Sequence, residues 1–231
     1  MSDPQPAPPL PSELPVLPLR QTVVFPLTIA PLSVGRPLSI DSINRALSGN
    51  RMLLLLLQET EADDPQPDDL CRVGTVGVIR QMAKTPTGMN ILVEGLTRAR
   101  ARSISRTDLV LQAAVEPYPD PTGGSIEVEA HVRRLRELVG RAAALSGGAA
   151  QELQGAVLSI DDPLRLCYLV ASLLDIKAAD RRQLLETDDL AAKLGLVSAA
   201  LSREISLLEL KGKIESQAQQ EMSDAQRQYY L

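Results

Sequence analysis

The chain has 231 residues, of which 44% are hydrophobic and 23% charged, and its formal net charge is −5 at pH 7. These values are typical of a soluble chain of one or two domains, and the acidic balance argues against non-specific binding to polyanions. No apolar run reaches the length that a membrane-spanning helix needs, and the N-terminus lacks the basic flank and apolar stretch of a secretory signal. We therefore expect a cytoplasmic protein that does not enter membranes.

The two cysteines of the chain are Cys71 and Cys167. Their separation fits no paired metal-binding or redox motif, and free cysteine is among the most buried residue types in proteins. We expect both thiols to be reduced and to lie in the core.

The first half of the chain predicts a domain made mainly of β-strands. Residues 1–13 are rich in proline and are expected to be disordered or extended. From residue 14 onward, short apolar runs alternate with turn signals, and one amphipathic segment predicts a helix. Residues 116–124 hold three prolines and two glycines, which marks a boundary near residues 119–124. The expected elements are strands at 14–19, 23–36 (bent at its prolines), 52–58, 72–84, 89–93 and 109–115, and a helix at 39–47.

Met82 and Met89 flank a predicted turn at residues 85–88. The flexible thioether of methionine is adaptable, so the pair could bind varied apolar peptides. The alternative is a hairpin end that packs on its own barrel, since methionine also fills gaps in cores.

Residues 59–69 form an acidic segment between two predicted strands. A calcium loop needs alternating oxygen ligands and a turn glycine. This segment carries Pro65 and Pro67 instead, so we expect a solvated loop.

Arg98, Arg100 and Arg102 alternate with small residues, which predicts three guanidinium groups on one face of a strand. Such a face could meet RNA phosphates. However, the whole chain has one Phe and four Tyr, and readout of single strands usually needs aromatic stacking. We therefore favour a solvated strand face and keep RNA binding as an alternative.

The second half predicts helices, with apolar residues at spacings of three and four. The clearest start is at Asp162 and Pro163, a capping residue followed by a proline in the first turn. The last and longest helix is expected at about residues 187–231. The apolar stripe of this helix narrows after Lys211. The remaining apolar area is too small for packing into a globular core, but it is large enough to contact a partner helix. Helices commonly end near Gly, Asn or Pro, and none of these follows residue 229. We therefore interpret the helix as truncated rather than terminated by its own sequence.

Several motifs follow one another in a fixed order over residues 14–231. They are Leu14-Pro15-Val16-Leu17-Pro18-Leu19-Arg20-Gln21-Thr22-Val23-Val24-Phe25-Pro26, Pro31-Leu32-Ser33-Val34-Gly35-Arg36, Gly74-Thr75-Val76-Gly77-Val78-Ile79, Val93-Glu94-Gly95-Leu96-Thr97-Arg98, Gln183-Leu184-Leu185-Glu186 and Gln226-Arg227-Gln228-Tyr229-Tyr230-Leu231. These motifs closely resemble ATP-dependent Lon proteases. The resemblance implies a PUA-like β-barrel for substrate recognition, followed by a helical bundle whose long helix leads into an AAA+ ATPase and a Ser-Lys peptidase. It also implies a homohexamer, with ATP and Mg²⁺ bound by the ATPase part that this chain lacks.

Catalytic motifs are not recognisable in the sequence. A phosphate-binding loop needs Gly-Lys followed by Ser or Thr, but Gly212-Lys213 is followed by Ile214. His131 is the only histidine and has no companion at ligand spacing, so a helix-surface or packing role is favoured over catalysis or metal binding. No Gly-x-Ser-x-Gly elbow is present, and a Ser-Lys dyad would leave no local signature. We expect no catalytic site, metal or cofactor in this chain.

Together these observations predict an α+β chain: a barrel-like recognition domain at 14–118, a linker at 119–124 and a helical bundle at 125–231. The expected function is non-catalytic capture of unfolded, damaged or tagged proteins for a Lon-type protease. A stand-alone binding module of the same fold and an RNA-binding barrel are the alternatives, and self-association through the long helix stays open. The candidate substrate contacts are Leu27, Ile29, Met82, Met89, Ile214, Met222, Tyr229 and Tyr230.

Overall fold

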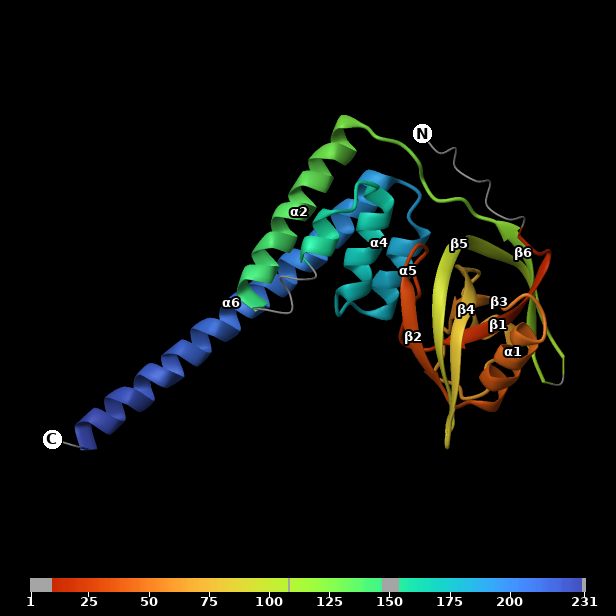
Figure 1. The fold of residues 1–231 in the computed structure, drawn as a ribbon, viewed down its shortest axis with the longest axis horizontal. Coiled ribbons are helices and arrows are strands. Elements are labelled where there is room, and N and C mark those ends of the chain that lie inside the picture. The colour runs from red at the N-terminus through yellow and green to blue at the C-terminus, as the bar shows by residue number, and fades with distance from the viewer. Residues whose placement is uncertain (1–9, 108, 147–153, 230–231) are drawn as a thin grey trace. The chain divides into compact units, whose positions relative to one another are not determined.

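The structure is a computed structural model that describes residues 10–107, 109–146 and 154–229, with side chains described up to residue 222. The predicted tail at 1–13 therefore lies mostly outside the described residues. The chain divides into two compact units. Unit 1 comprises residues 1–122 and 171–188, and unit 2 comprises residues 123–170 and 189–231. Figure 1 shows that the strands, accompanied by short helices, belong to the first unit and that the second unit contains helices.

Unit 1 contains a six-stranded sheet in the order β2-β5-β4-β3-β1-β6. Strand β5 also pairs with β6, so five of the strands close into a barrel and β2 is added at one side. Strands β1 and β3 run parallel, and the other pairs are antiparallel. The strands are β1 Glu13–Leu19, β2 Ile29–Val34, β3 Met52–Leu57, β4 Val73–Thr85, β5 Gly88–Arg106 and β6 Leu111–Pro117.

The length of β5 is what closes the barrel. One of its edges pairs with β4 from residue 88 to residue 100. The other edge pairs first with β2 and then, from Ala99 onward, with β6. The α+β fold class is thereby confirmed, with the sheet first and the long helix last.

Two clusters of buried side chains fill unit 1. The first includes Leu14, Val16 and Leu54, and the second includes Leu17, Leu53 and Leu55. Because successive residues of a strand point to opposite sides, the continuous Leu run of β3 supplies both clusters. Helix α1 (Pro37–Leu47) contributes Ile43 and Ala46 to the second cluster.

The predicted strand at 23–36 is shorter than expected. Only β2, Ile29–Val34, is a strand, because the chain turns at Pro26 and Leu27 first. The predicted strands at 89–93 and 109–115 are parts of β5 and β6, and a single 3₁₀ turn, Pro67–Asp69, interrupts the acidic loop.

Unit 1 also includes helix α5 (Ala178–Glu186), which packs on β4 and buries Leu184 and Leu185. In the sequence, α5 is far from the strands, because the chain passes through residues 123–170 of unit 2 between β6 and α5. Residues 171–188, which lie within the predicted bundle at 125–231, cluster with the sheet.

Unit 2 is helical. It contains α2 (Ile126–Ser146), a helical turn at residues 154–158, most of α4 (Pro163–Leu173) and α6 (Leu190–Tyr229). The backbone N–H of Leu164 donates to Asp162 Oδ1 over 2.9 Å, which confirms the predicted helix start. Helix α2 packs along α6. None of the helices in the described part of the chain is long and apolar enough to cross a membrane.

Helix α6 runs for 40 residues without interruption at Gly195 or Gly212. Gly195 faces α2, because a Cβ placed there would lie 3.6 Å from His131 Cε1. The lone histidine thus lies at the packing surface of two helices, as expected for a packing role.

Candidate functional site

The candidate contacts on the barrel include two exposed apolar residues that are separated by one residue in the chain. Leu27 is 42% exposed and Ile29 is 60% exposed. Leu27 lies in the turn that precedes β2, and Ile29 is the first residue of β2, opposite Glu94 of β5. The backbone N–H of Leu27 donates to the carbonyl of Gly95 over 2.9 Å, which ties this turn to the barrel.

The backbone of Leu27 is in the left-handed region, with φ of 60°. Pro26 precedes it, and the hydroxyl of Thr28 donates to the carbonyl of Phe25 over 2.7 Å. A turn with proline in its second position and a positive φ in its third normally carries Gly or Asn there. An exposed leucine in this position is a strained arrangement, and such strain is frequent at functional sites.

The two methionines differ in their placement. Met82 lies in β4 and is 37% exposed, whereas Met89 is 6% exposed and belongs to the second core cluster. The expectation that both are surface contacts is therefore wrong for Met89, because its position in β5, between Val34 of β2 and Lys84 of β4, turns it inward. This burial agrees with the alternative of a hairpin end packed on its own barrel.

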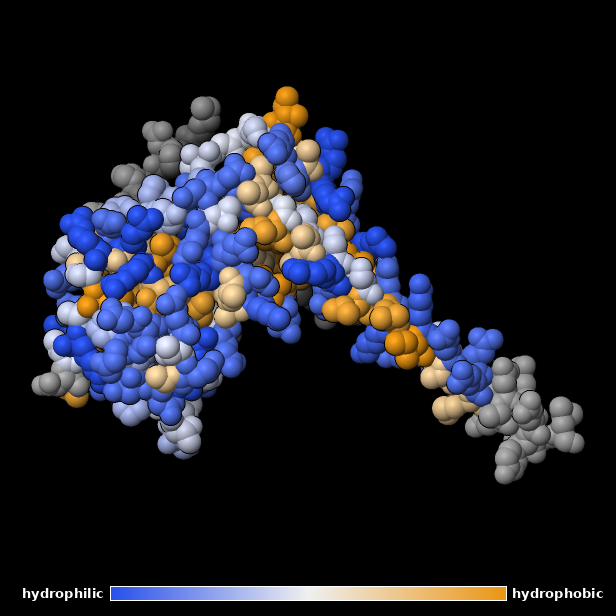
Figure 2. All heavy atoms as spheres, turned by 180° about the vertical axis from the view of Figure 1, so that it is seen from behind, coloured by the Kyte–Doolittle hydropathy of each residue, from blue (hydrophilic) through white to orange (hydrophobic). Residues whose placement is uncertain are grey.

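The candidates in unit 2 lie on α6. Ile214 is 57% exposed and Met222 is 67% exposed. Leu207 and Leu210, which the sequence analysis did not single out, are exposed as well. At 3.6 residues per turn these four residues occupy about a third of the helix circumference. Figure 2 shows apolar residues gathered along this part of α6. The side chain of Tyr229 and residue Tyr230 lie outside the described residues.

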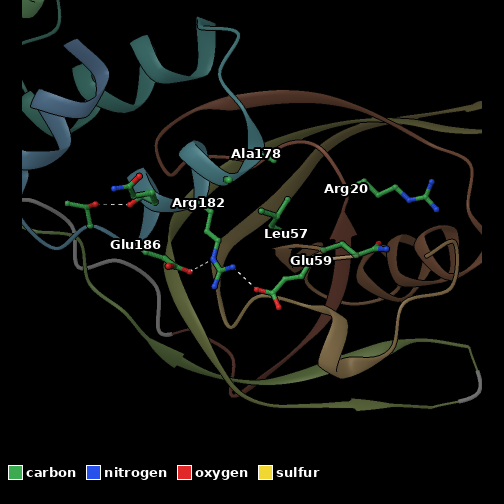
Figure 3. Close-up of a pocket in the computed structure, with 10 residues that line it drawn as sticks. Arg20, Leu57, Glu59, Ala178, Arg182 and Glu186 are labelled. Atoms are coloured by element: carbon green, nitrogen blue, oxygen red, sulfur yellow. Dashed lines mark hydrogen bonds and ion pairs between the residues drawn. The ribbon is translucent and has the colours of Figure 1, made fainter. Parts of the chain in front are cut away.

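A cleft of about 700 Å³ lies in unit 1 beside α5. Figure 3 shows Arg182 reaching from α5 into this cleft between two carboxylates. It donates to Glu59 over 2.5 Å and to Glu186 over 2.9 Å. The hydrogen bond with Glu186 is the main reason that the pKa of Arg182 is raised. Because the central guanidinium is already paired twice, we assign no ligand to this cleft.

Cys71 lies beside the same cleft and is buried. Its thiol lies 3.7 Å from Glu59 Oε1. Burial is the main cause that raises the pKa of Cys71 to about 11. The thiolate is the nucleophilic form of cysteine, and a raised pKa disfavours it. Cys167 is buried too, so both cysteines lie in the core, as expected.

Arginine side chains pair with carboxylates of the acidic loop at 59–69. Arg20 pairs with Asp63, Arg72 with Asp68, and Arg106 with Asp64. Within the described residues, no group of three His, Cys, Asp or Glu side chains could hold a metal ion.

The three arginines of β5 do not form one solvated face. Arg98 is buried, whereas Arg100 and Arg102 are exposed. The register of β5 against β6 shifts between Ala101 and Ser103, so the strict alternation that the prediction assumed is broken at Arg102. Arg102 pairs with Glu116, and the guanidinium of Arg100 lies 4.5 Å from the ring centre of Tyr118.

Arg98 has a different environment from its two neighbours. Its side chain is fully buried and lies between Asp120, Asp188 and several backbone carbonyls. The sequence predicts a surface position for Arg98, because the groups that surround it come from positions 21 to 90 residues further along the chain. No local spacing signals such partners.

Comparison with known proteins places these features in a family. The profile of the ATP-dependent protease La (LON) substrate-binding domain matches residues 13–203. The Lon protease of Desulfovibrio desulfuricans is 37% identical over 225 residues, covering 96% of this chain and 26% of that protein. The Lon protease of Escherichia coli K12 is 37% identical over 221 residues, covering 95% of this chain and 28% of that protein. The chain thus spans about a quarter of the length of these relatives.

Two solved structures share the fold. The N-terminal domain of the Mycobacterium avium complex Lon protease superposes with a TM-score of 0.69 at 22% identity, covering 82% of this chain and 98% of that one. A Lon N-terminal domain protein from Xanthomonas campestris superposes with a TM-score of 0.57 at 18% identity, covering 81% of this chain and 97% of that one.

Proposed function

Because this chain belongs to the family of Lon substrate-binding domains, we propose that it is the recognition segment of a longer ATP-dependent protease and captures unfolded polypeptides through exposed apolar side chains. In such a protein the ATPase and the peptidase lie in other segments, together with ATP and Mg²⁺. The part played by the present residues is to hold a polypeptide non-covalently, without a chemical step. Its partners are unfolded or damaged proteins.

The observation that carries this proposal is the apolar stripe on α6, formed by Leu207, Leu210, Ile214 and Met222. The same helix buries Leu194, Val197, Leu201 and Ile205 in unit 2, whereas the stripe lies beyond that packed part. Contiguous exposed apolar surface is uncommon on proteins and marks interaction sites. Unfolded polypeptides differ from folded ones by the apolar side chains that they expose, and an apolar stripe selects for that difference.

We expect the double variant Leu210→Glu/Ile214→Glu to bind unfolded polypeptide at least about tenfold more weakly. Burying one such side chain contributes about 1.5–3 kcal/mol, and 1.4 kcal/mol corresponds to a factor of ten in affinity. The probe is a reduced and alkylated protein that cannot refold, titrated by fluorescence anisotropy, with the native form of the same protein as the negative probe.

The matched control is Ser216→Glu/Gln219→Glu, which adds the same two charges to the opposite side of α6 at exposed positions. This control should bind like the parent. Equal binding by all three proteins would exclude the stripe as a contact. Sedimentation of the same samples separates substrate capture from self-association: a changed mass with unchanged binding would assign the stripe to a second copy of the chain.

The turn at Leu27 gives a second test, in which stability and binding are expected to change in opposite directions. Leu27→Gly removes an exposed side chain and relieves a backbone conformation that costs a non-glycine residue about 1–2 kcal/mol. We therefore expect a higher free energy of unfolding, by about 1 kcal/mol, together with weaker binding of the unfolded probe. Chemical denaturation and anisotropy measure the two quantities. A variant that gains stability and keeps full affinity would exclude Leu27 from the contact surface.

A further inference from the structure

Arg98 is a charged residue in the interior of unit 1, where carboxylates and backbone carbonyls surround its guanidinium. Its Nε lies 2.8 Å from Asp120 Oδ1, and its Nη2 lies 3.1 Å from Asp188 Oδ1. Nη1 donates to the carbonyl of Leu185 over 2.7 Å, and Nη2 donates to the carbonyl of Pro119 over 2.5 Å. A buried charge is tolerated only when it is paired and its donors are satisfied, so these contacts form a single interdependent set.

These partners belong to the two segments by which the chain leaves unit 1. The first departure follows Thr122, and the second follows Asp188. Pro119 and Asp120 lie just before the first departure, and Leu185 and Asp188 lie just before the second. The guanidinium of Arg98, fixed on strand β5, therefore contacts both segments at one point.

Tyr118 connects the two segments directly. Its hydroxyl donates to Asp188 Oδ2 over 2.7 Å, and its ring centre lies 4.2 Å from the guanidinium carbon of Arg98. The ring is also within 4.5 Å of the guanidinium carbon of Arg100, so it lies against two cations. A cation over a tyrosine face is attracted by the ring quadrupole. The carboxylate of Asp188 thus accepts one hydrogen bond from Arg98 of β5 and one from Tyr118 of the first segment.

We propose that Arg98 is a clamp that fixes both departing segments, residues 118–120 and 185–188, to the closed barrel, and that its release frees these segments while the barrel stays folded. It acts as a positioning residue and touches no substrate in this proposal. Asp188 is the partner through which the clamp opens, because its side chain is 65% exposed whereas that of Asp120 is 13% exposed. The proposal is independent of substrate capture.

Amide hydrogen exchange distinguishes a clamp from an ordinary core residue, because it reports local opening separately from global unfolding. In Arg98→Met we expect exchange at least about tenfold faster at Tyr118, Asp120 and the end of α5, with unchanged exchange in β1, β3 and β4. Arg98→Lys retains the charge but loses the planar fork, which reaches several acceptors at once, and should show the same pattern to a smaller extent. Arg102→Gln is the control, since it removes an exposed arginine of the same strand.

Two results would overturn the proposal. One is unchanged exchange in both segments of Arg98→Met. The other is equal acceleration throughout unit 1, which would mean that Arg98 only contributes to the core. If Arg98→Met does not fold, Asp188→Asn tests the proposal instead, because this substitution changes only the exposed partner of Arg98. It should accelerate exchange at residues 185–188 by more than at any barrel strand, and a uniform or absent change would again contradict the clamp.

Discussion

Gly74→Ala is expected to destabilise the barrel by about 3 kcal/mol or more. A Cβ at this position would lie well inside 3.0 Å of the carbonyl oxygen of Leu55, and 2.6 Å from Leu56 Cδ2. Real Cβ atoms essentially never approach other atoms within 3.0 Å. Inserting one carbon into a packed core typically costs about 1–3 kcal/mol and occasionally more. The cost here is at the upper end, because the nearest atom belongs to the backbone of β3 and cannot rotate away.

Urea unfolding followed by the NMR amide signals of β3 and β4 measures this effect in unit 1 itself. Gly212→Ala is the matched control: it is the same chemical change in the exposed part of α6, where nothing lies within 4 Å of the added carbon. It should stabilise the helix by about 1 kcal/mol, the difference in helix propensity between the two residues. A Gly74→Ala variant within 1 kcal/mol of the parent would show that β3 and β4 can separate at little cost.

The elements that could be predicted from the sequence are those whose signals are local. The apolar run at residues 14–19 gave β1, the Asp162 cap with Pro163 gave the start of α4, and the apolar period after residue 187 gave α6. In each case the determining residues lie within a few positions of one another. The family resemblance, carried by ordered motifs, is confirmed by the match to residues 13–203.

The features that the sequence did not disclose depend on distant or exceptional contacts. Arg98 looked like one of three equivalent surface arginines, yet its partners come from residues 118–120 and 185–188. Met89 and Met82 have the same side chain on the same hairpin, but Met89 lies in the strand that pairs with β2 and belongs to the buried cluster, whereas Met82 is partly exposed. Leu27 occupies a conformation that its residue type disfavours, so propensity predicts the opposite of what is observed.

Leu194→Ala is expected to unfold unit 2 at lower denaturant concentration and to leave the barrel transition in place. Leu194 is fully buried in α6, and α2 packs along this helix. Truncating a buried leucine to alanine costs about 2–5 kcal/mol, because the lost contacts leave a cavity. Effects of distant sites are independent, and Leu194 belongs to unit 2. Circular dichroism at 222 nm should report the loss of helix, while the amide signals of β3 and β4 report the barrel.

Leu207→Ala is the control on the same helix, since its side chain is exposed and surface substitutions usually change stability by less than about 0.5 kcal/mol. If Leu194→Ala shifted the helical and the barrel transitions together, the two units would form one cooperative structure. Separate transitions would have a direct consequence for the proposed function. Binding of the unfolded probe at a denaturant concentration where only unit 2 is melted would then measure the contribution of Leu27 and Ile29 without that of the α6 stripe.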